Sequence, residues 1–195
     1  MADKVLGDLI KAVLADHVDE VRSLIDAGAL LTANPQIGNS VMRTACQGNA
    51  LRVMRVLLEH GVDPNERITY TSLIDGRVEE NYTPLMYAST AAMVDLLVSF
   101  GADVNAVSAT GLSALMRFAF FGIDDAVEAM LTHGADTTLR QHVREGKKAL
   151  TALELSHEKL AFMEPLLADS PKPATVAIAL QRYRRTIALL SAVRV

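Results

Sequence analysis

The stretch "TPLMYASTAAMVDLLVSFGADVN" (residues 83–105) decides the fold class. It opens with Thr83, a residue type that caps helix starts, and Pro84 in the first turn, where a missing N–H leaves no helical hydrogen bond unmade. Apolar residues at helical spacing follow as far as Gly101, and glycine is the residue that most readily adopts the left-handed conformation past a helix end. The stretch therefore predicts two short helices joined by a turn.

The glycine-terminated helix recurs along the chain. It is found as "VRSLIDAGA" (21–29), "MRVLLEHGV" (54–62), "VDLLVSFGA" (94–102) and "VEAMLTHGA" (127–135). A capped segment precedes three of these runs, as "SVMRTA" (40–45), "TPLMYA" (83–88) and "SALMRF" (113–118), and "TALELS" (151–156) begins a further unit. Such self-similarity is the sequence signature of a repeat architecture, in which each unit packs on its neighbours.

One spacing between the closing glycines differs from the others. Gly28, Gly61, Gly101 and Gly134 are separated by 33, 40 and 33 residues. The longer interval has ten extra residues before Thr83 and three fewer between Thr83 and Gly101 than the corresponding segments of the neighbouring units. An insertion and a short deletion thus explain the exception, and the repeat is preserved.

This unit of about 33 residues is similar to the ankyrin repeat, over roughly residues 5–170. The resemblance implies an all-α solenoid of about five helix-turn-helix units, with an inserted β-hairpin and a C-terminal capping helix. We expect residues 1–195 to form a single domain. Its parts would be an N-terminal cap repeat (3–33), a repeat (38–66), the hairpin (67–82), two repeats (82–107 and 111–138), a degenerate repeat (149–170) and the capping helix (174–193).

The insertion itself predicts a hairpin. Within "ITYTSLIDGRVEENYT" (68–83), the pair Asp75-Gly76 separates two segments rich in β-branched and aromatic residues. An Asp-Gly pair favours a two-residue type I′ turn, because that turn needs positive φ at both central positions. In ankyrin-repeat proteins a β-turn projects between successive units, and here the resemblance implies that this projection is lengthened.

Composition excludes several classes of protein. Half of the 195 residues are hydrophobic and the net charge is −4, which argues against a disordered chain and against a protein acting mainly on nucleic acid. The single cysteine, Cys46, cannot form an internal disulfide. Acidic residues interrupt the N-terminal segment, and no run approaches the roughly 20 apolar residues of a membrane span. We therefore expect a cytoplasmic protein.

Candidate catalytic residues do not form a recognisable motif. His60 and His133 each precede a closing glycine, where an imidazolium would interact favourably with the helix C-terminus. Cys46 follows Ala45 in a predicted helix, and an inert packing thiol is the favoured interpretation. We expect no enzyme activity, no cofactor and no metal. The basic run at 140–148 is interpreted as a solvated loop, with steering of an acidic partner as the alternative.

The resemblance implies a protein-binding function, through the turn tips and the inner surface of each first helix. Asn39, Tyr82 and Leu112 precede the caps, whereas Gln47, Phe120 and Phe121 lie late in the first helices. Tyrosine and arginine often dominate interface energy. The predicted partner-binding residues are therefore Asn39, Arg43, Gln47, Tyr70, Leu73, Tyr82, Tyr87, Leu112, Arg117, Phe120 and Phe121. We expect Phe121 to pack with Phe118 and Phe120 to lie nearer solvent, and the alternative is that both are core residues.

The C-terminal helix permits a second interpretation. Its apolar residues form one stripe, composed of Val176, Leu180, Tyr183, Ile187 and Leu190. This stripe would seal the last repeat, but the arginines beside it also suit a basic amphipathic helix on a membrane surface. The favoured function is a protein-binding module that contacts its partner through the concave face and the extended hairpin, as an adaptor or as a dedicated inhibitor or immunity protein. A membrane-associated scaffold and an undetected enzymatic or ligand-binding activity are the alternatives.

Overall fold

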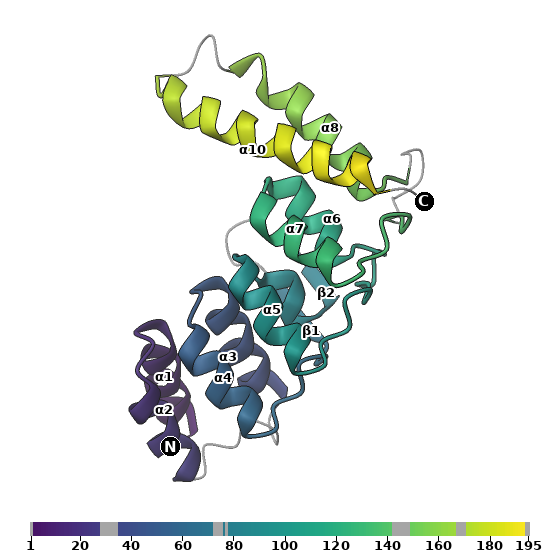
Figure 1. Cartoon of the computed structure of the whole chain (residues 1–195). Helices are drawn as coiled ribbons and strands as arrows, with labels where there is room; N and C mark the ends of the chain where they lie inside the picture. Colours follow the sequence, from purple (N-terminus) through teal and green to yellow (C-terminus); the bar gives the residue numbers. More distant parts are fainter. Residues whose placement is uncertain are drawn as a thin grey trace. The chain divides into compact units, whose positions relative to one another are not determined.

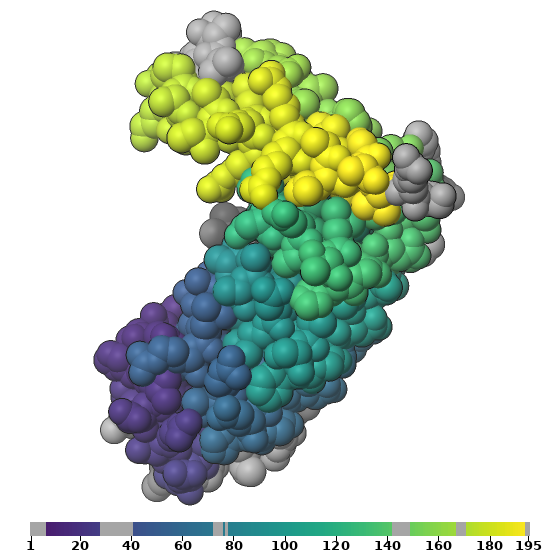
Figure 2. All heavy atoms as spheres, in the orientation of Figure 1, coloured from purple at the N-terminus to yellow at the C-terminus, as the bar shows by residue number. Residues whose placement is uncertain are grey.

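The computed structural model describes residues 2–27, 35–71, 76, 78–141, 149–166 and 171–193, with side chains described from residue 7 onward except for 35–40 (Figure 1). The chain divides into two compact units, Met1–Asp103 (unit 1) and Val104–Val195 (unit 2). Figure 2 draws the same view as spheres, in which unit 1 runs from purple to teal. The single-domain expectation for residues 1–195 stays a prediction.

The described elements are predominantly helical, with one small antiparallel sheet. Unit 1 contains α1 (Ala2–Leu14), α2 (Val18–Asp26), α3 (Pro35–Gln47), α4 (Leu51–Glu59), β1 (Ile68–Thr71), β2 (Val78–Tyr82), the 3₁₀ helix η1 (Pro84–Tyr87) and α5 (Ala91–Ser99). Unit 2 contains α6 (Ala114–Phe121), α7 (Asp124–Thr132), α8 (Ala152–Met163) and α10 (Pro173–Ala192).

The helices of unit 1 pack as pairs in two layers. In the first-helix layer, α3 contacts both α1 and η1. In the second-helix layer, α4 contacts both α2 and α5, and each second helix packs against its own first helix. The helix-turn-helix repetition predicted from the sequence is therefore present, whereas the number of repeats stays a prediction.

The predicted helix ends are found at three of the four glycines. Gly61, Gly101 and Gly134 have φ values of +82°, +88° and +78°, which only glycine adopts without strain. His60 and His133 are the C-cap residues of α4 and α7, as their positions before glycine predicted. Gly28 lies outside the described residues.

Two of the predicted helix starts are wrong. The backbone of α3 begins at Pro35, so Ser40 lies inside the helix and does not cap it. Proline is favourable at the first helical position because its φ is already helical, which allows the earlier start. The segment after Thr83 forms only the four-residue 3₁₀ helix η1, because the three missing residues leave no room for a longer first helix.

Two other predicted caps are confirmed. The Ser113 side chain accepts a hydrogen bond from the backbone N–H of Met116 and so starts α6. Thr151 and Glu154 bond reciprocally at the start of α8, as a capping box. Each cap satisfies backbone donors that a helix start leaves without partners.

Asparagine side chains connect the turns that follow successive repeats. In unit 1, Asn65 Oδ1 accepts from the backbone N–H of Asp103 at 2.7 Å, and Asn65 Nδ2 donates to the Gly101 carbonyl at 2.8 Å. In unit 2, Asn105 Oδ1 accepts from the N–H of Asp136 at 2.8 Å. The "DPN" and "DVN" segments thus hold each turn to the next one.

The predicted hairpin is confirmed, but its register is not the expected one. A two-residue loop at Asp75-Gly76 requires Thr71 to pair with Glu80, whereas the structure pairs Thr71 with Val78. The register shifts between Ile68 and Tyr70, opposite a stretch of β2 where Asn81 adopts a left-handed φ of +57°. None of the pairs on either side of this shift fits a two-residue loop at Asp75-Gly76, and an extra bulged residue on β2 accounts for the shift between them. Asp75 itself lies outside the described residues.

In unit 2, α10 takes the place of a second helix. It packs against α8, which precedes it, and against α7, the second helix of the preceding repeat. Leu180, Tyr183 and Leu190 of the predicted stripe are buried, and Val176 and Ile187 are half-buried. The helix α10 thus covers α8, the first helix of the last unit, as predicted for a helix that seals the last repeat.

Candidate functional site

The hairpin of unit 1 brings an aromatic ring to an arginine of the neighbouring repeat. The guanidinium carbon of Arg43, on α3, lies 3.8 Å from the centre of the Tyr70 ring on β1. Arg43 Nη1 also donates to Gln47 Oε1 at 3.2 Å, one helical turn further along α3. A guanidinium over a tyrosine face is an attractive arrangement, and it fixes both side chains. Three predicted residues from two separate elements therefore meet.

The second strand and η1 support this arrangement. The Tyr87 hydroxyl donates to Glu79 Oε2 at 2.8 Å, and the rings of Tyr82 and Tyr87 lie 5.6 Å apart at a tilted angle. Tyr87 is only 3% exposed, so it anchors β2 and offers almost no surface to a partner. Tyr70 and Tyr82 are half-buried and keep accessible area. We call Arg43, Gln47, Tyr70, Glu79, Tyr82 and Tyr87 the tyrosine–arginine cluster.

Burial and a neighbouring charge perturb one carboxyl group just before the hairpin. Partial burial raises the pKa of Glu66, and the adjacent carboxylate of Asp63 raises it further. Asp63 Oδ1 also accepts from the Asn65 backbone N–H at 2.8 Å, which closes the turn that leads into β1. The base of the hairpin is therefore held to the repeat by its own turn hydrogen bonds.

Unit 2 exposes a group of phenylalanines at the end of α6. Phe120 is 39% exposed and Phe121 is 53% exposed, and their rings meet edge to face at 5.2 Å. The Arg117 guanidinium lies 5.2 Å from the Phe121 ring, and Lys159 Nζ lies 4.8 Å from the Phe120 ring. Lys159 Nζ also lies 5.0 Å from Phe162, a ring that is 63% exposed. We call Arg117, Phe120, Phe121, Lys159 and Phe162 the phenylalanine cluster.

The expected packing of Phe121 is wrong. Phe118 is fully buried, whereas Phe121 is exposed and does not share the environment of Phe118. Phe121 is also more exposed than Phe120. Phe121 is the last residue of α6, and the chain turns away at Gly122 with φ +65°. A ring at this position projects beyond the helix that would cover it. The alternative in which both Phe120 and Phe121 are core residues is also wrong.

Of the other predicted residues, the structure describes the side chain of Leu112 but not those of Asn39 and Leu73. Leu112 is half-buried and is held by Ser108, whose Oγ accepts from the Leu112 N–H at 3.2 Å and whose N–H donates to the Leu112 carbonyl at 3.0 Å. The Asn39 backbone belongs to α3, but its side chain is outside the described part of the chain. Leu73 also lies outside it. Both remain predictions.

The sequence interpretation missed three contributors to the clusters. Glu79 is half-buried and receives the Tyr87 hydroxyl, whereas Lys159 and Phe162 come from α8. The spacing of Lys159 and Phe162 could have indicated them, because residues three apart share one face of a helix. Nothing in the sequence indicated that this face meets Phe120.

The described residues offer little for covalent or metal chemistry. Cys46 is buried in α3, and burial raises the pKa of its thiol far above the ordinary value of 9.0, so the thiol stays protonated. Among the described residues, no three His, Cys, Asp or Glu side chains lie together as metal ligands. His60 Nδ1 lies 2.7 Å from the Val56 carbonyl, which accounts for its orientation at the end of α4.

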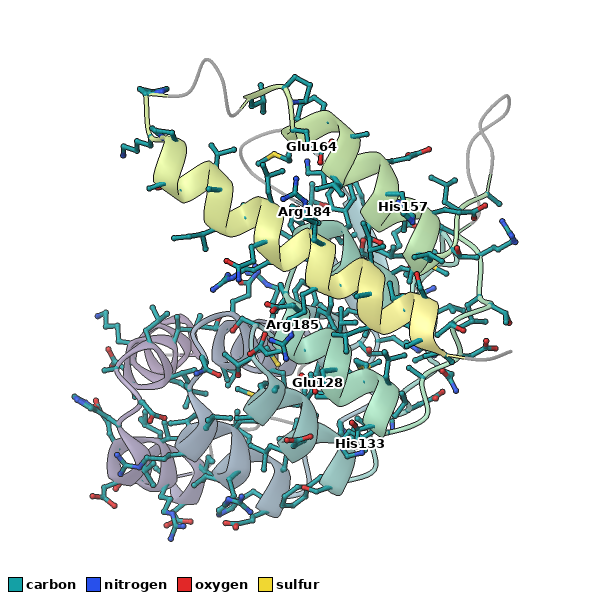
Figure 3. All side chains as sticks on the ribbon, turned by 45° about the horizontal axis from the view of Figure 1, so that its top comes forward. Glu128, His133, His157, Glu164, Arg184 and Arg185 are labelled. Atoms are coloured by element: carbon teal, nitrogen blue, oxygen red, sulfur yellow. The ribbon has the colours of Figure 1, made fainter. Side chains whose placement is uncertain are left out.

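The arginines of α10 are engaged within unit 2. Arg185 pairs with Asp124 at 2.8 Å and with Glu128, and Arg184 pairs with Glu164 at 3.1 Å (Figure 3). Arg182 Nε lies 4.0 Å from Asp124. A membrane surface would have to compete with these carboxylates, which argues against the basic amphipathic interpretation. Within the described ranges, no helix has both the length and the apolar character to cross a bilayer.

Comparison with known proteins finds a matching family model and several similar proteins. A family model described as the ankyrin repeat matches residues 80–109. The chain is 31% identical over 132 residues to human neurogenic locus notch homolog protein 2, an alignment that covers 66% of this chain and 5% of that protein. It is also 31% identical over 126 residues to chicken NF-kappa-B inhibitor alpha, covering 64% of this chain and 39% of the relative. The chain thus spans only a part of these proteins.

Proposed function

This chain is an ankyrin-repeat protein, and we propose that it binds a partner protein through the tyrosine–arginine cluster of unit 1 and catalyses no reaction. Ankyrin repeats generally mediate protein–protein interaction. The observation that carries the proposal is the Arg43 guanidinium stacked at 3.8 Å over the half-buried Tyr70 ring. Tyrosine and arginine are the residue types most enriched among those that dominate binding energy.

Preorganisation supports the choice of this cluster. Arg43 is fixed both by Tyr70 and by Gln47, and β2 is fixed by the Tyr87–Glu79 hydrogen bond. Side chains that are already ordered lose little conformational entropy when a partner binds. An extended hairpin edge also presents backbone groups that a partner strand can pair with. The cluster therefore offers aromatic area, a positive charge and backbone hydrogen bonds in one place.

The direct test uses a partner recovered with the wild-type protein. Affinity capture from the native cells with mass spectrometry identifies it, and the dissociation constant is then measured with purified components. Arg43→Ala and Tyr70→Ala should each weaken binding about tenfold or more, as interface residues of this type do. Glu80→Ala, an exposed change on the same hairpin, is the matched control and should bind as the wild type does. Equal affinities for all four proteins would contradict the proposal.

The phenylalanine cluster of unit 2 is a second candidate surface for the same function. Phe121 and Phe162 expose large rings, and Arg117 and Lys159 lie against the cluster's rings. Such exposed apolar area is typical of interaction sites. Phe121→Ala should weaken partner binding if this surface takes part. Ile178→Ala removes an exposed apolar side chain from α10 outside the cluster and should have no effect.

We further propose that binding inhibits the partner. One relative carries the name of an inhibitor, and a preorganised binding surface suits occlusion of a partner's surface. An adaptor would instead bind two proteins at once. Titrating the captured partner's own activity with this protein distinguishes the two roles, because an inhibitor abolishes that activity in proportion to occupancy whereas an adaptor leaves it intact.

A further inference from the structure

A groove crosses the second-helix layer of unit 1, on different elements from the tyrosine–arginine cluster. Its volume is about 480 Å³. Side chains of α2, α4 and α5 line it, and they come from three successive repeats: Val18, Arg22, Leu51, Arg52, Arg55, Val56, Glu59, Ala92 and Leu96. The groove therefore exists only because these helices lie side by side.

The floor of the groove is apolar. Val56 and Leu96 are buried, and Val18 and Leu51 are half-buried with area left to cover. A ligand that places an aliphatic side chain there would remove this area from water, which is favourable.

The rim of the groove is positively charged. Arg22, Arg52 and Arg55 line it against a single carboxylate, Glu59. Arg22 Nη2 is 3.9 Å from Glu59, and both side chains are about half exposed, so this pair is weak. Arg52 and Arg55 are exposed and form no ion pair with any residue that the structure describes. This local excess of positive charge is opposite in sign to the net charge of −4 of the chain.

The surroundings of the groove limit the kind of anion that fits. An adjoining depression is lined by Asp16, Asp19 and Glu20, and it shares Arg52 with the groove. A continuous polyanion such as RNA would have to pass close to these carboxylates and would be repelled. A short ligand, whose negative charge is confined to the groove, would not be. Guanidinium groups also match carboxylate geometry in paired hydrogen bonds.

We propose that this arginine groove binds an acidic peptide segment, with its carboxylates on Arg52 and Arg55 and an aliphatic side chain on the floor between α2, α4 and α5. Arg52 and Arg55 are three residues apart on α4, which separates their Cα atoms by about 4.5 Å along the helix axis. Acidic residues flanking a leucine can reach both. The groove would give the protein a second ligand, beyond the partner proposed for the hairpin.

The test uses the full chain and a defined probe, the fluorescein-labelled peptide GSELEELEGS, followed by fluorescence anisotropy at low salt. We expect saturable binding that Arg52→Ala/Arg55→Ala weakens about tenfold or more. The control Arg182→Ala/Arg184→Ala changes the net charge equally on α10 and should bind as the wild type does. Replacing the leucines of the probe by serine should weaken binding severalfold, because serine does not cover the apolar floor of the groove. Circular dichroism verifies that both variants stay folded.

Several results would overturn the proposal. Equal weakening by both double variants would show that only net charge matters, and the absence of binding at millimolar probe would remove the site. Tighter binding of a twelve-residue oligothymidylate that displaces the peptide would assign the groove to nucleic acid. Amide chemical shifts should change in α2, α4 and α5, and changes confined to the hairpin would place the peptide elsewhere. Arg43→Ala should leave probe binding unchanged, so this test is independent of the proposal for the hairpin.

Discussion

The turn between α6 and α7 permits a stability prediction whose size follows from the geometry. Gly122 has φ +65°, and a Cβ placed on it would lie 3.1 Å from two atoms of the Tyr183 ring. Tyr183 is buried, and its hydroxyl donates to the Phe120 carbonyl at 2.9 Å, so the ring cannot withdraw without losing that bond. Burial also raises the pKa of this hydroxyl, so it remains a donor at neutral pH. Gly122→Ala therefore adds a steric conflict to the backbone strain.

A matched glycine separates the two effects. Gly134 has φ +78°, but a Cβ there meets nothing within 4 Å. Gly134→Ala should lower the free energy of unfolding by about 1–2 kcal/mol, the strain of a left-handed alanine. Gly122→Ala should lower the free energy of unfolding by about 1–2 kcal/mol more than Gly134→Ala does, because the new methyl group overpacks a rigid ring. At about 2–4 °C per kcal/mol for a chain of this size, Tm should fall clearly further for Gly122→Ala than for Gly134→Ala.

The measurement is thermal and urea unfolding, followed by far-ultraviolet circular dichroism. A Tyr183→Ala background supplies the control, because without the ring Gly122→Ala should lose no more stability than Gly134→Ala does. If the two glycine variants are equally destabilised in the wild-type background, the close approach of α10 to the α6–α7 turn is refuted.

Three further predictions concern single side chains. Tyr87→Phe removes the donor to Glu79 and should lower the free energy of unfolding by about 1–2 kcal/mol, and an unchanged urea midpoint would argue against that hydrogen bond. The thiol of Cys46 should resist Ellman's reagent until the protein unfolds. Burial raises the pKa of this thiol in the folded protein, whereas in the unfolded chain the thiol ionises near its ordinary pKa of 9.0. The contribution of the buried thiol to stability is therefore complete below pH 9. Above pH 9 the free energy of unfolding should decline by about 1.4 kcal/mol per pH unit, relative to Cys46→Ala. Arg185→Ala breaks partly exposed pairs with Asp124 and Glu128 and should cost less than about 1 kcal/mol, with a smaller loss at high salt, whereas a large loss of stability would show that these pairs are structurally essential.

Much of the fold could be predicted because its determinants are local. A glycine with positive φ, a serine cap and an apolar stripe each act within a few residues, so Gly101, Ser113 and Leu180 were assigned correctly from the sequence alone. The repetition of these features then identified the architecture. The hairpin was predictable in the same way, from β-branched and aromatic residues on either side of an Asp-Gly pair.

The sequence-based predictions were wrong where a change in segment length or an irregularity in the chain overrides a local preference. The turn preference of Asp75-Gly76 implied one register, but the strands pair in another, which shifts again at the bulge near Asn81. A capped "TPLMYA" segment resembles the start of an α-helix, yet the deletion after it leaves a 3₁₀ turn. Phe121 fits a helical face shared with Phe118, but the helix ends at that residue. Spacing rules assume that a helix continues or that a strand keeps its register, and these segments break one or the other assumption.

The two side-chain clusters show why candidate sites are harder to predict than repeats. Arg43 and Tyr70 are far apart in sequence, and so are Phe120 and Lys159, so neither contact leaves a periodic pattern. Both clusters involve irregular positions, namely the inserted hairpin and the end of α6. At regular positions the buried face and the turn hydrogen bonds of Asn65 restrict which residues are tolerated. An irregular segment carries fewer such restrictions, so its exposed residues can vary to suit a partner without loss of the fold. In a repeat protein, departures from regularity are therefore the first places to test for binding.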